Sequence, residues 1–256
     1  MNVQPGGGSI LPDFLKSCEA CPARHGGVCD RIGPEELAAL NRMARHRRFA
    51  PGQTILAESE EPEFLANILS GAVKLTKSLP DGRQQIVGLL FPPDFLGRAL
   101  GRGENCLAEA ATEVELCCYP AKPFRALLQS CPALERRLLE KALDELDAAR
   151  EWMVLLGRKS AREKVASFFL MLARRAALSH CATCAGAGPL KVAVPLKRAD
   201  IADYLGLTIE TVSRQITALK TRGILVPTED GLFAVPDMDA LARMAGHEDG
   251  TDHWHT

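Results

Sequence analysis

Three cysteines near the start of the chain have the spacing of metal ligands. Cys18, Cys21 and Cys29 form a C-x2-C-x7-C pattern in a stretch that also contains Pro22 and Gly26-Gly27. Thiolates are the usual ligands of iron–sulfur clusters, and a cubane cluster takes four of them. A C-x2-C pair is also half of a zinc site. The spacing alone therefore leaves iron–sulfur and zinc chemistry open, and a fourth ligand has to come from elsewhere in the chain.

A fourth thiol is available from Cys106, Cys117 or Cys118. Cys117 and Cys118 are neighbours in a predicted strand, and adjacent strand residues point to opposite faces of a sheet. Only one of these two side chains can therefore face the N-terminal cysteines. Cys106 follows the Gly-rich loop at residues 101–103, and a flexible loop could also reach them.

The expected compartment affects how the cysteines are interpreted. No apolar run is long enough for a membrane helix, and the N-terminal residues predict no signal peptide, so we expect a cytoplasmic protein. A reducing compartment disfavours disulfides, so clustered cysteines there indicate metal binding or redox chemistry. We interpret Cys131 as structural. The Cys181-x2-Cys184 pair favours an incidental role, with zinc or a redox switch as alternatives.

Residues 196–219 form a predicted helix-turn-helix. Ala202 is small where a second helix must approach, Gly206 permits a left-handed turn, and Thr208 can cap the following helix. Its predicted buried side consists of Ile201, Leu205, Ile209, Val212, Ile216 and Leu219. Groove-entering helices contact base edges with their first residues. The candidates for DNA contact are therefore Thr208, Glu210, Thr211, Ser213 and Arg214. Residues 223–235 predict a two-stranded wing.

The elements around these motifs divide the chain into five regions. Residues 1–33 are a loop-like arm, and residues 34–130 predict an antiparallel sandwich or roll, with strands at 54–58, 65–69, 72–78, 84–90 and 112–119. A long helix at 131–157, a DNA-binding region at 158–235 and a C-terminal tail at 236–256, which is polar after Gly246, follow. The net charge of −1 conceals an asymmetry, because residues 158–235 contain 12 Lys and Arg against 6 Asp and Glu. A basic segment of this kind favours nucleic acid as a partner.

The long helix carries a narrow apolar seam. Its members recur at steps of three and four residues: Leu139, Ala142, Leu146, Ala149, Met153 and Leu156. Such a seam either faces a core or pairs with a second copy in a coiled coil. Because a helix of about seven turns rarely finds cover within one domain, we expect a dimer contact.

This combination of a β-roll, a long helix and a winged motif containing Glu-Thr-Val-Ser-Arg resembles the catabolite activator protein/FNR superfamily of bacterial regulators. The resemblance covers residues 18–247. Ile209 and Ser213 follow the FNR pattern, and the seven-residue interval before Cys29 is similar to the alphaproteobacterial FnrL, FnrN and FixK-like branch. The resemblance implies an α+β fold with a cyclic-nucleotide-binding-like β-roll at the N-terminus, a dimerisation helix and a C-terminal winged helix-turn-helix.

The resemblance also implies the cofactor and its ligands. The family's pattern places a [4Fe-4S] cluster on Cys18, Cys21, Cys29 and Cys117, with Cys117 chosen by alignment on Pro120. Loss of this cluster in oxygen would weaken dimerisation and DNA binding. Residues 97–109 lack the Arg-Ser/Thr pair that a cyclic phosphate needs, so we expect no cyclic nucleotide as ligand.

The implied partners are a TTGAT-N4-ATCAA-like double-stranded DNA site, a second copy of the chain, and RNA polymerase. Arg214 and Glu210 would contact a G·C pair, and Ser213 would lie beside a thymine. The predicted hairpin tip Asp81-Gly82-Arg83 corresponds to a polymerase-contacting patch, although a bare turn explains the same residues. The alternatives are a zinc-containing, redox-insensitive regulator and a thiol redox protein. No nucleophile–base pair or phosphate loop is evident, so we expect no enzyme.

Overall fold

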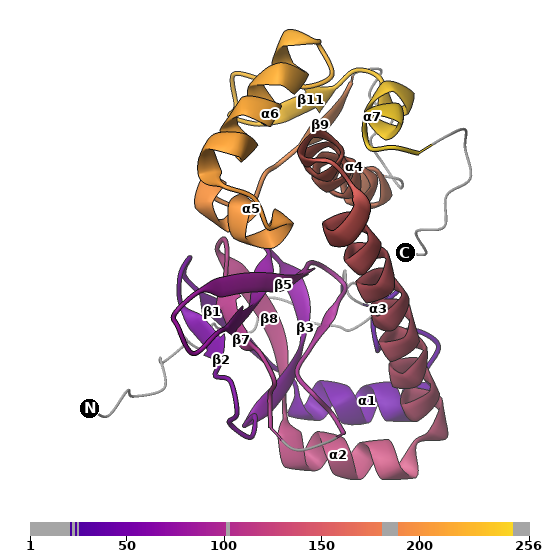
Figure 1. Ribbon diagram of the computed structural model, residues 1–256. Helices are drawn as coiled ribbons and strands as arrows, with labels where there is room; N and C mark the ends of the chain where they lie inside the picture. Colours follow the sequence, from indigo (N-terminus) through magenta and orange to yellow (C-terminus); the bar gives the residue numbers. More distant parts are fainter. Residues whose placement is uncertain (1–20, 22–23, 25, 101–102, 181–188, 248–256) are drawn as a thin grey trace. The chain divides into compact units, whose positions relative to one another are not determined.

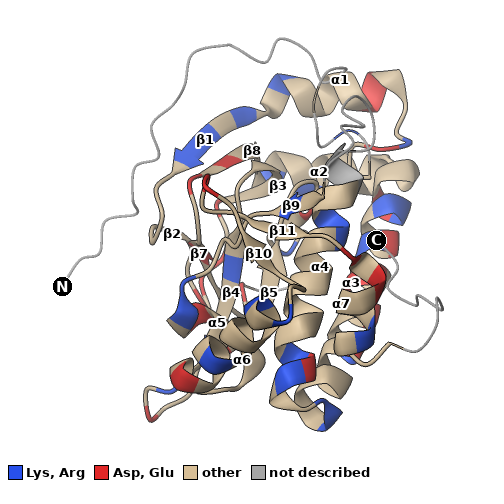
Figure 2. Cartoon of the chain, turned by 90° about the horizontal axis from the view of Figure 1, so that it is seen from above, with Lys and Arg blue, Asp and Glu red and all other residues tan. Residues whose placement is uncertain are grey.

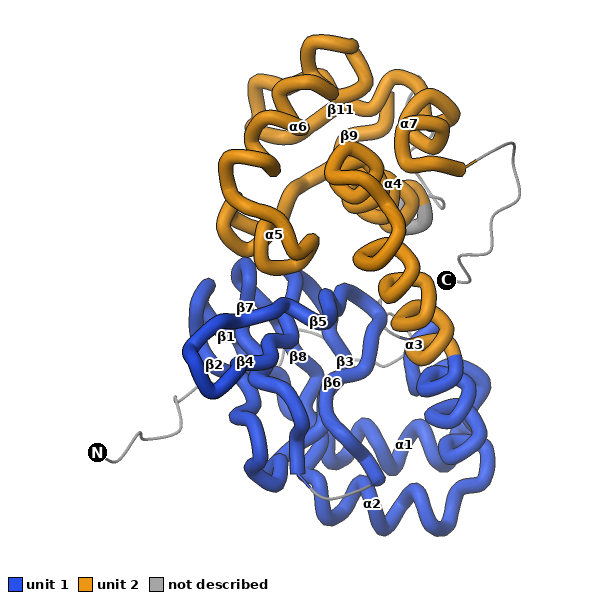
Figure 3. Tube along the Cα trace, in the orientation of Figure 1, with its two compact units in different colours: residues 1–143 blue, residues 144–256 orange. Residues whose placement is uncertain are grey.

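The computed structural model describes residue 21, residue 24 and residues 26–100, 103–180 and 189–247, without the side chains of residues 178–180. The chain forms two compact units, residues 1–143 and 144–256 (Figure 3). Each unit is described by itself below.

Two four-stranded antiparallel sheets form the body of the first unit (Figure 1). One sheet has the order β1-β8-β3-β6, formed by β1 (Arg45–Phe49), β8 (Val114–Pro120), β3 (Phe64–Ser70) and β6 (Phe95–Leu96). The other has the order β2-β7-β4-β5, formed by β2 (Thr54–Leu56), β7 (Leu107–Ala110), β4 (Val73–Ser78) and β5 (Gln84–Leu90). Neighbouring strands in both sheets pair antiparallel, which confirms the predicted architecture.

The pleat of β8 divides its side chains between two cores. Leu116 and Cys118 belong to a cluster between the sheets, here called the inter-sheet core, which also contains Phe49, Ile68, Val73 and Ala108. Cys117 and Tyr119 belong to the helix-side core, which also contains Val28, Cys29, Leu40, Leu65, Phe124 and Leu134. Alternate residues of a strand thus face different surroundings, as strand geometry requires.

Two helices of this unit were not predicted. They are α1 (Pro34–Met43) and α2 (Ala121–Ser130), and both contribute to the helix-side core. In α2, Ala121, Phe124 and Leu128 recur at helical spacing and are buried. In α1 Leu40 is buried, and Leu37 and Met43 are partly buried against the same core. The end of the N-terminal arm also packs into this core, through Val28, Cys29 and Ile32.

β1 is a basic edge strand. Four of its five residues are arginine or histidine, and it lies at the end of its sheet beside β8 (Figure 2). Charged side chains on an edge strand disfavour pairing with another strand. His46 contacts Glu115 at 3.2 Å, and Arg48 contacts the same carboxylate at 3.5 Å.

The long helix α3 (Pro132–Arg158) leaves its apolar seam open to solvent. Within this chain Leu139 is 60% exposed, Leu146 44% and Met153 69%. Ala142 and Ala149 are also exposed, and Leu156 is partly buried. Leu143 and Val154, exposed as well, widen the stripe beyond the predicted seam.

The second unit is a winged helix-turn-helix. After α3 follow α4 (Ala161–His180), β9 (Leu190–Val192), α5 (Arg198–Leu205), α6 (Ile209–Thr221), β10 (Val226–Pro227), β11 (Phe233–Val235) and α7 (Met238–Met244). The predicted two-stranded wing has a third strand, because the sheet order is β10-β11-β9. No described helix is both long and apolar enough to cross a membrane.

The region assigned to the C-terminal tail, residues 236–256, begins with a packed helix, α7. The carboxylate of Asp237 caps α7 by accepting a hydrogen bond from the backbone N–H of Ala240 at 2.9 Å. Leu241 and Ala245 are fully buried, and Lys159 donates a hydrogen bond to the Ala245 carbonyl at 2.8 Å. Seven residues give too little periodicity to stand out, although the capping aspartate was a usable signal.

Truncation of Leu241 to alanine tests whether α7 belongs to the folded unit. We expect Leu241→Ala to lower the free energy of unfolding by about 2–5 kcal/mol, because it leaves a cavity in a closed core. Asp239→Ala, at an exposed position of the same helix, serves as the control. Denaturant unfolding followed by circular dichroism measures both. A loss below about 1 kcal/mol for Leu241→Ala would show that α7 adds little to the unit.

Candidate cysteine site and DNA-reading surface

Cys29 and Cys117 converge in the helix-side core. Their side chains are 5% and 6% exposed, and each sulfur lies beside the hydroxyl of Tyr119, at 3.5 and 3.4 Å respectively. Asn67 donates from Nδ2 to the same hydroxyl at 3.1 Å and to the sulfur of Cys29 at 3.4 Å. Two thiols separated by 88 positions in the sequence thus share one polar contact inside an apolar core.

The remaining predicted ligands are distributed as follows. Cys21 is partly buried and packs against the helix-side core, the same core that holds Cys29 and Cys117. Cys18 lies outside the described residues. Cys118 faces the inter-sheet core, and Cys106 is partly exposed and donates to Asn105 at 3.4 Å. Of the candidates for a fourth ligand, Cys117 alone shares a core with Cys21 and Cys29.

The donor set fits a thiolate-bound metal group in its chemistry. Within the described residues, no three His, Cys, Asp or Glu side chains are grouped closely enough to hold a metal ion. Two sulfurs near one hydroxyl, with a third thiol against the same core, nevertheless supply the ligand type that iron–sulfur clusters and zinc take. Cys131 is buried in the same core at the end of α2, and Cys181 and Cys184 lie outside the described residues.

Burial controls the protonation of this site. It raises the pKa of the Cys117 thiol to about 12, and the hydrogen bond with Tyr119 opposes part of that rise. Burial, with the neighbouring Cys117 and Cys29, also raises the pKa of Tyr119 well above its usual value. Both groups are therefore protonated at neutral pH without a metal. Since metal ligation needs thiolates, binding must release protons.

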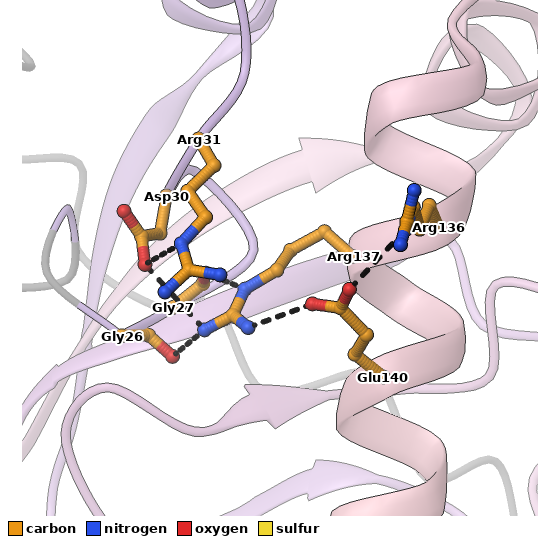
Figure 4. Close-up of polar contacts among 7 residues, drawn as sticks. All are labelled: Gly26, Gly27, Asp30, Arg31, Arg136, Arg137 and Glu140. Atoms are coloured by element: carbon orange, nitrogen blue, oxygen red, sulfur yellow. Dashed lines mark hydrogen bonds and ion pairs between the residues drawn. The ribbon is translucent and has the colours of Figure 1, made fainter.

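Arg137 fastens the segment before Cys29 to α3 (Figure 4). Its guanidinium donates to the Gly27 carbonyl at 3.1 Å and to the Gly26 carbonyl at 2.9 Å. It also contacts Asp30 at 3.7 Å and Glu140 at 3.1 Å, and its side chain is only 12% exposed. No sequence pattern predicts the two hydrogen bonds to Gly26 and Gly27, because their acceptors are backbone carbonyls about 110 positions away from Arg137.

The helix-turn-helix has the predicted local chemistry. Gly206 ends α5 in the left-handed conformation, at a φ of 60° that favours glycine. Thr208 caps α6 by accepting a hydrogen bond from the Thr211 backbone N–H at 3.3 Å. Ile201, Leu205, Val212, Ile216 and Leu219 are buried as predicted. Ile209 is 47% exposed, which corrects the prediction; it is the first residue of α6, where the helix is not yet covered.

The start of α6 presents its polar side chains outward. Glu210, Ser213, Arg214 and Thr208 are exposed, and Thr211 is partly buried. Arg214 donates to the Thr211 hydroxyl at 3.4 Å. Hydrogen bonds from its own backbone N–H and from Thr208 lower the pKa of Glu210, so this side chain is a carboxylate at neutral pH. The surface combines a fork of donors with an acceptor on successive turns of one helix.

An aromatic stack joins the end of α3 to α5. The rings of Trp152 and Tyr204 lie with centroids 4.1 Å apart and planes at 22°, and Tyr204 is 4% exposed. Phe168 of α4 contacts Tyr204 edge-on at 6.0 Å. Aromatic rings packed in this way hold their elements in a fixed relation within the second unit.

The tip between β4 and β5 is a self-contained turn. Arg83 donates from its backbone N–H and from Nε to the carboxylate of Asp81, at 3.1 and 2.8 Å. Gly82 has a φ of 86°, and all three residues are exposed.

Comparisons with known proteins agree with this architecture. Residues 46–131 match the cyclic nucleotide-binding domain model, and residues 163–244 match the Crp-like helix-turn-helix domain model. The chain is 43% identical to the transcriptional activator protein FnrL of Cereibacter sphaeroides, over 93% of this chain and 95% of that protein. It is 41% identical to the nitrogen fixation regulation protein FixK of Bradyrhizobium diazoefficiens, over 84% of this chain and 88% of that protein. The structure of FixK2 from Bradyrhizobium japonicum superposes with a TM-score of 0.70 at 33% identity, covering 78% of this chain and 96% of that one.

Proposed function

The chain belongs to the Crp/FNR family of transcription regulators, and from this premise we propose that it is a homodimeric activator that senses oxygen through a [4Fe-4S] cluster. The convergence of Cys29 and Cys117 on one hydroxyl carries the sensory part of the proposal. Cys18 and Cys21 complete the ligand set. The cluster would supply the reaction with oxygen. No cyclic nucleotide takes part, since residues 97–109 contain no Arg-Ser/Thr pair.

The exposed face of α6 suits a base sequence of the type TTGAT-N4-ATCAA. Arg214 can donate two hydrogen bonds to guanine O6 and N7, and Glu210 can accept from cytosine N4 of the same pair. Ser213 lies on the same face, where it would meet a thymine. The two half-sites of a palindrome require a two-fold dimer.

The exposed stripe of α3 provides the surface for that dimer. Leu139, Leu146 and Met153 are large apolar side chains that water covers in the isolated chain. Pairing with a second α3 would remove them from water, at about 25 cal/mol for each Å² of apolar surface. The acidic residues Asp144, Glu145, Asp147 and Glu151 on the same helix would repel one another across the pair. Because each exposed repulsion is weak, a small loss of support can shift such a balanced equilibrium.

Arg137 and Trp152 give α3 its connections to the two functional sites. Arg137 binds the peptide just before Cys29, in the first unit. Trp152 stacks on Tyr204 of the helix-turn-helix, in the second unit. When the arm is held against the sheet, Arg137 has its carbonyl partners. Release of the arm would leave a largely buried guanidinium short of acceptors, which weakens the packing at the start of α3.

Replacement of Arg137 tests this connection. We expect Arg137→Ala to lower the affinity of the anaerobic protein for its DNA site roughly tenfold or more, since a hydrogen bond to a charged group contributes about 1.5–3 kcal/mol. Its iron content should stay unchanged. Arg136→Ala is the matched control, because Arg136 is the adjacent arginine with an 83% exposed side chain. Fluorescence anisotropy on labelled duplex measures both. Equal affinities for the two variants would remove Arg137 from the coupling.

The exposed tip Asp81-Gly82-Arg83 is the proposed contact with RNA polymerase. Its internal hydrogen bonds fix the turn before any partner arrives, which lowers the entropic cost of binding. We expect Arg83→Ala to reduce activated transcription in vitro several-fold while leaving DNA affinity within a factor of two. Undiminished transcription would make the tip a turn without a partner.

The proposal as a whole is tested by anaerobic purification. We expect a brown protein that contains iron and acid-labile sulfide, and that loses its colour and its affinity for a TTGAT-N4-ATCAA duplex together in air. A colourless protein loaded with zinc that binds DNA equally in air would replace the oxygen sensor by a redox-insensitive regulator. Binding of the same protein to a duplex with both half-sites scrambled is the control for specificity.

A further inference from the structure

Asn67 is a polar side chain in an unusual place. It is 1% exposed, lies directly opposite Cys117 in the pairing of β3 with β8, and contacts Tyr119, which is 2% exposed. Its Nδ2 donates to both the Tyr119 hydroxyl and the Cys29 sulfur, while its Oδ1 is buried with no hydrogen-bond partner among the described residues. A buried acceptor without a partner costs free energy, so stability alone is a poor reason for this residue.

The side chains of Asn67, Tyr119, Cys29 and Cys117 have a definite number of hydrogens to donate. In the metal-free site, the thiol of Cys117 donates to the Tyr119 oxygen, and the contact between Tyr119 and Cys29 can have either group as donor. A ligating cysteine is a thiolate and has no hydrogen to give. Asn67 has two hydrogens on Nδ2 and Tyr119 has one on its oxygen.

Two thiolates use all three hydrogens. Asn67 donates one to the Cys29 sulfur and one to the Tyr119 oxygen, along the contacts already present. Tyr119, accepting from Asn67, then turns its own hydrogen to the Cys117 sulfur 3.4 Å away. Each sulfur receives one donor. The opposite orientation of the Asn67 amide would set carbonyl lone pairs against a thiolate, so the orientation present, with Nδ2 towards Cys29 and Tyr119, is the one that suits a metal-loaded site.

We propose that Asn67 and Tyr119 are positioning residues of the metal site, which donate hydrogen bonds to the ligand sulfurs of Cys29 and Cys117. This rests on the proposed function only in that those two cysteines bind metal. Hydrogen bonds to ligand sulfurs lower their electron density and so affect both metal retention and the spectrum and potential of an iron–sulfur cluster. The pair therefore sets how firmly the site holds its metal, beyond filling space in the core.

Tyr119→Phe separates the hydrogen-bonding role of Tyr119 from its role in packing the core. The variant keeps the ring and its contact with Phe124, at 5.5 Å between centroids, and removes only the hydroxyl. Tyr204→Phe is the matched control, because it removes another buried tyrosine hydroxyl from the second unit. Asn67→Ala is the second variant. Thermal unfolding of the metal-free proteins verifies that each variant folds.

The measurement is anaerobic transfer of metal from the full-length protein to a chelator, together with the absorption spectrum of the loaded protein. We expect Tyr119→Phe and Asn67→Ala to release metal about 10- to 100-fold faster than the parent and to shift its sulfur-to-iron bands. Tyr204→Phe should match the parent. Release rates and bands equal to those of the parent in both variants would overturn the inference while leaving the cluster in place.

Failure of the proposed function has a different signature. If the parent holds zinc in place of iron, the same release rates are measured for zinc, and the inference still requires faster loss from both variants. A parent that holds neither metal would overturn both the cluster and the role of Asn67 and Tyr119.

Discussion

Cys117→Ser is expected to abolish stable iron binding, whereas Cys118→Ser, one residue further along β8, is expected to keep it. The two side chains are almost equally buried, at 6% and 3% exposed, but they lie in different cores. Cys117 shares the helix-side core with Cys21 and Cys29, and Cys118 faces the inter-sheet core near Arg47. A cluster that loses one of four thiolates should keep less than a tenth of its iron after anaerobic reconstitution and desalting. Iron and sulfide assays per chain measure this.

The pair of variants is matched in burial, chemistry and position, so a general effect of Cys-to-Ser replacement on stability would appear in both. Cys106→Ser gives a further comparison, because Cys106 is partly exposed in a loop. Iron loss in Cys118→Ser with retention in Cys117→Ser would make Cys118 the ligand in place of Cys117. Loss in Cys106→Ser alone would place the fourth ligand in the loop that precedes β7. Each result names a different ligand.

Elements with strong local signals were predictable from the sequence. The strand expected at 84–90 coincides with β5, and the helix expected at 131–157 differs from α3 by one residue at each end. The turn glycine Gly206 and the cap Thr208 behave as their types require. In these segments period, turn chemistry and capping agree, and such agreement specifies local structure.

Contacts between distant segments were not predictable in the same way. Asn67 and Tyr119 meet because β3 pairs with β8 in one register, and a shift of one residue would turn Asn67 to the other face. Arg137 binds backbone carbonyls, which leave no mark in a side-chain pattern. The helices α1 and α7 have only 10 and 7 residues, which is too short for a helix to be stable on its own. Their stability therefore depends on packing against the cores that they cover. Spacing and the family resemblance named the candidate ligands, and only the fold showed what surrounds the described ones.

Arg214→Ala is expected to cost about 1–3 kcal/mol of binding free energy for each half-site, and to remove the preference for G·C at one position. Arg214 is exposed on the first turns of α6, with Thr211 beside its guanidinium at 3.4 Å. A dimer contacts two half-sites, so the loss is counted twice. Anisotropy titrations at one fixed salt concentration, with the parent duplex and with a duplex in which that G·C pair is changed, measure affinity and preference separately.

Arg222→Ala is the control for charge alone. Arg222 is an exposed arginine at the opposite end of α6, where it caps the helix. Its removal takes away the same charge but no base contact, so any loss of affinity should be small and equal for both duplexes. If Arg214→Ala also weakened both duplexes equally, its guanidinium would contact the phosphate backbone, and discrimination would have to come from Glu210 and Ser213. A base contact affects the two duplexes differently and a phosphate contact affects them equally. The ratio of the affinities for the parent duplex and the changed duplex therefore decides whether Arg214 recognises a base or the backbone.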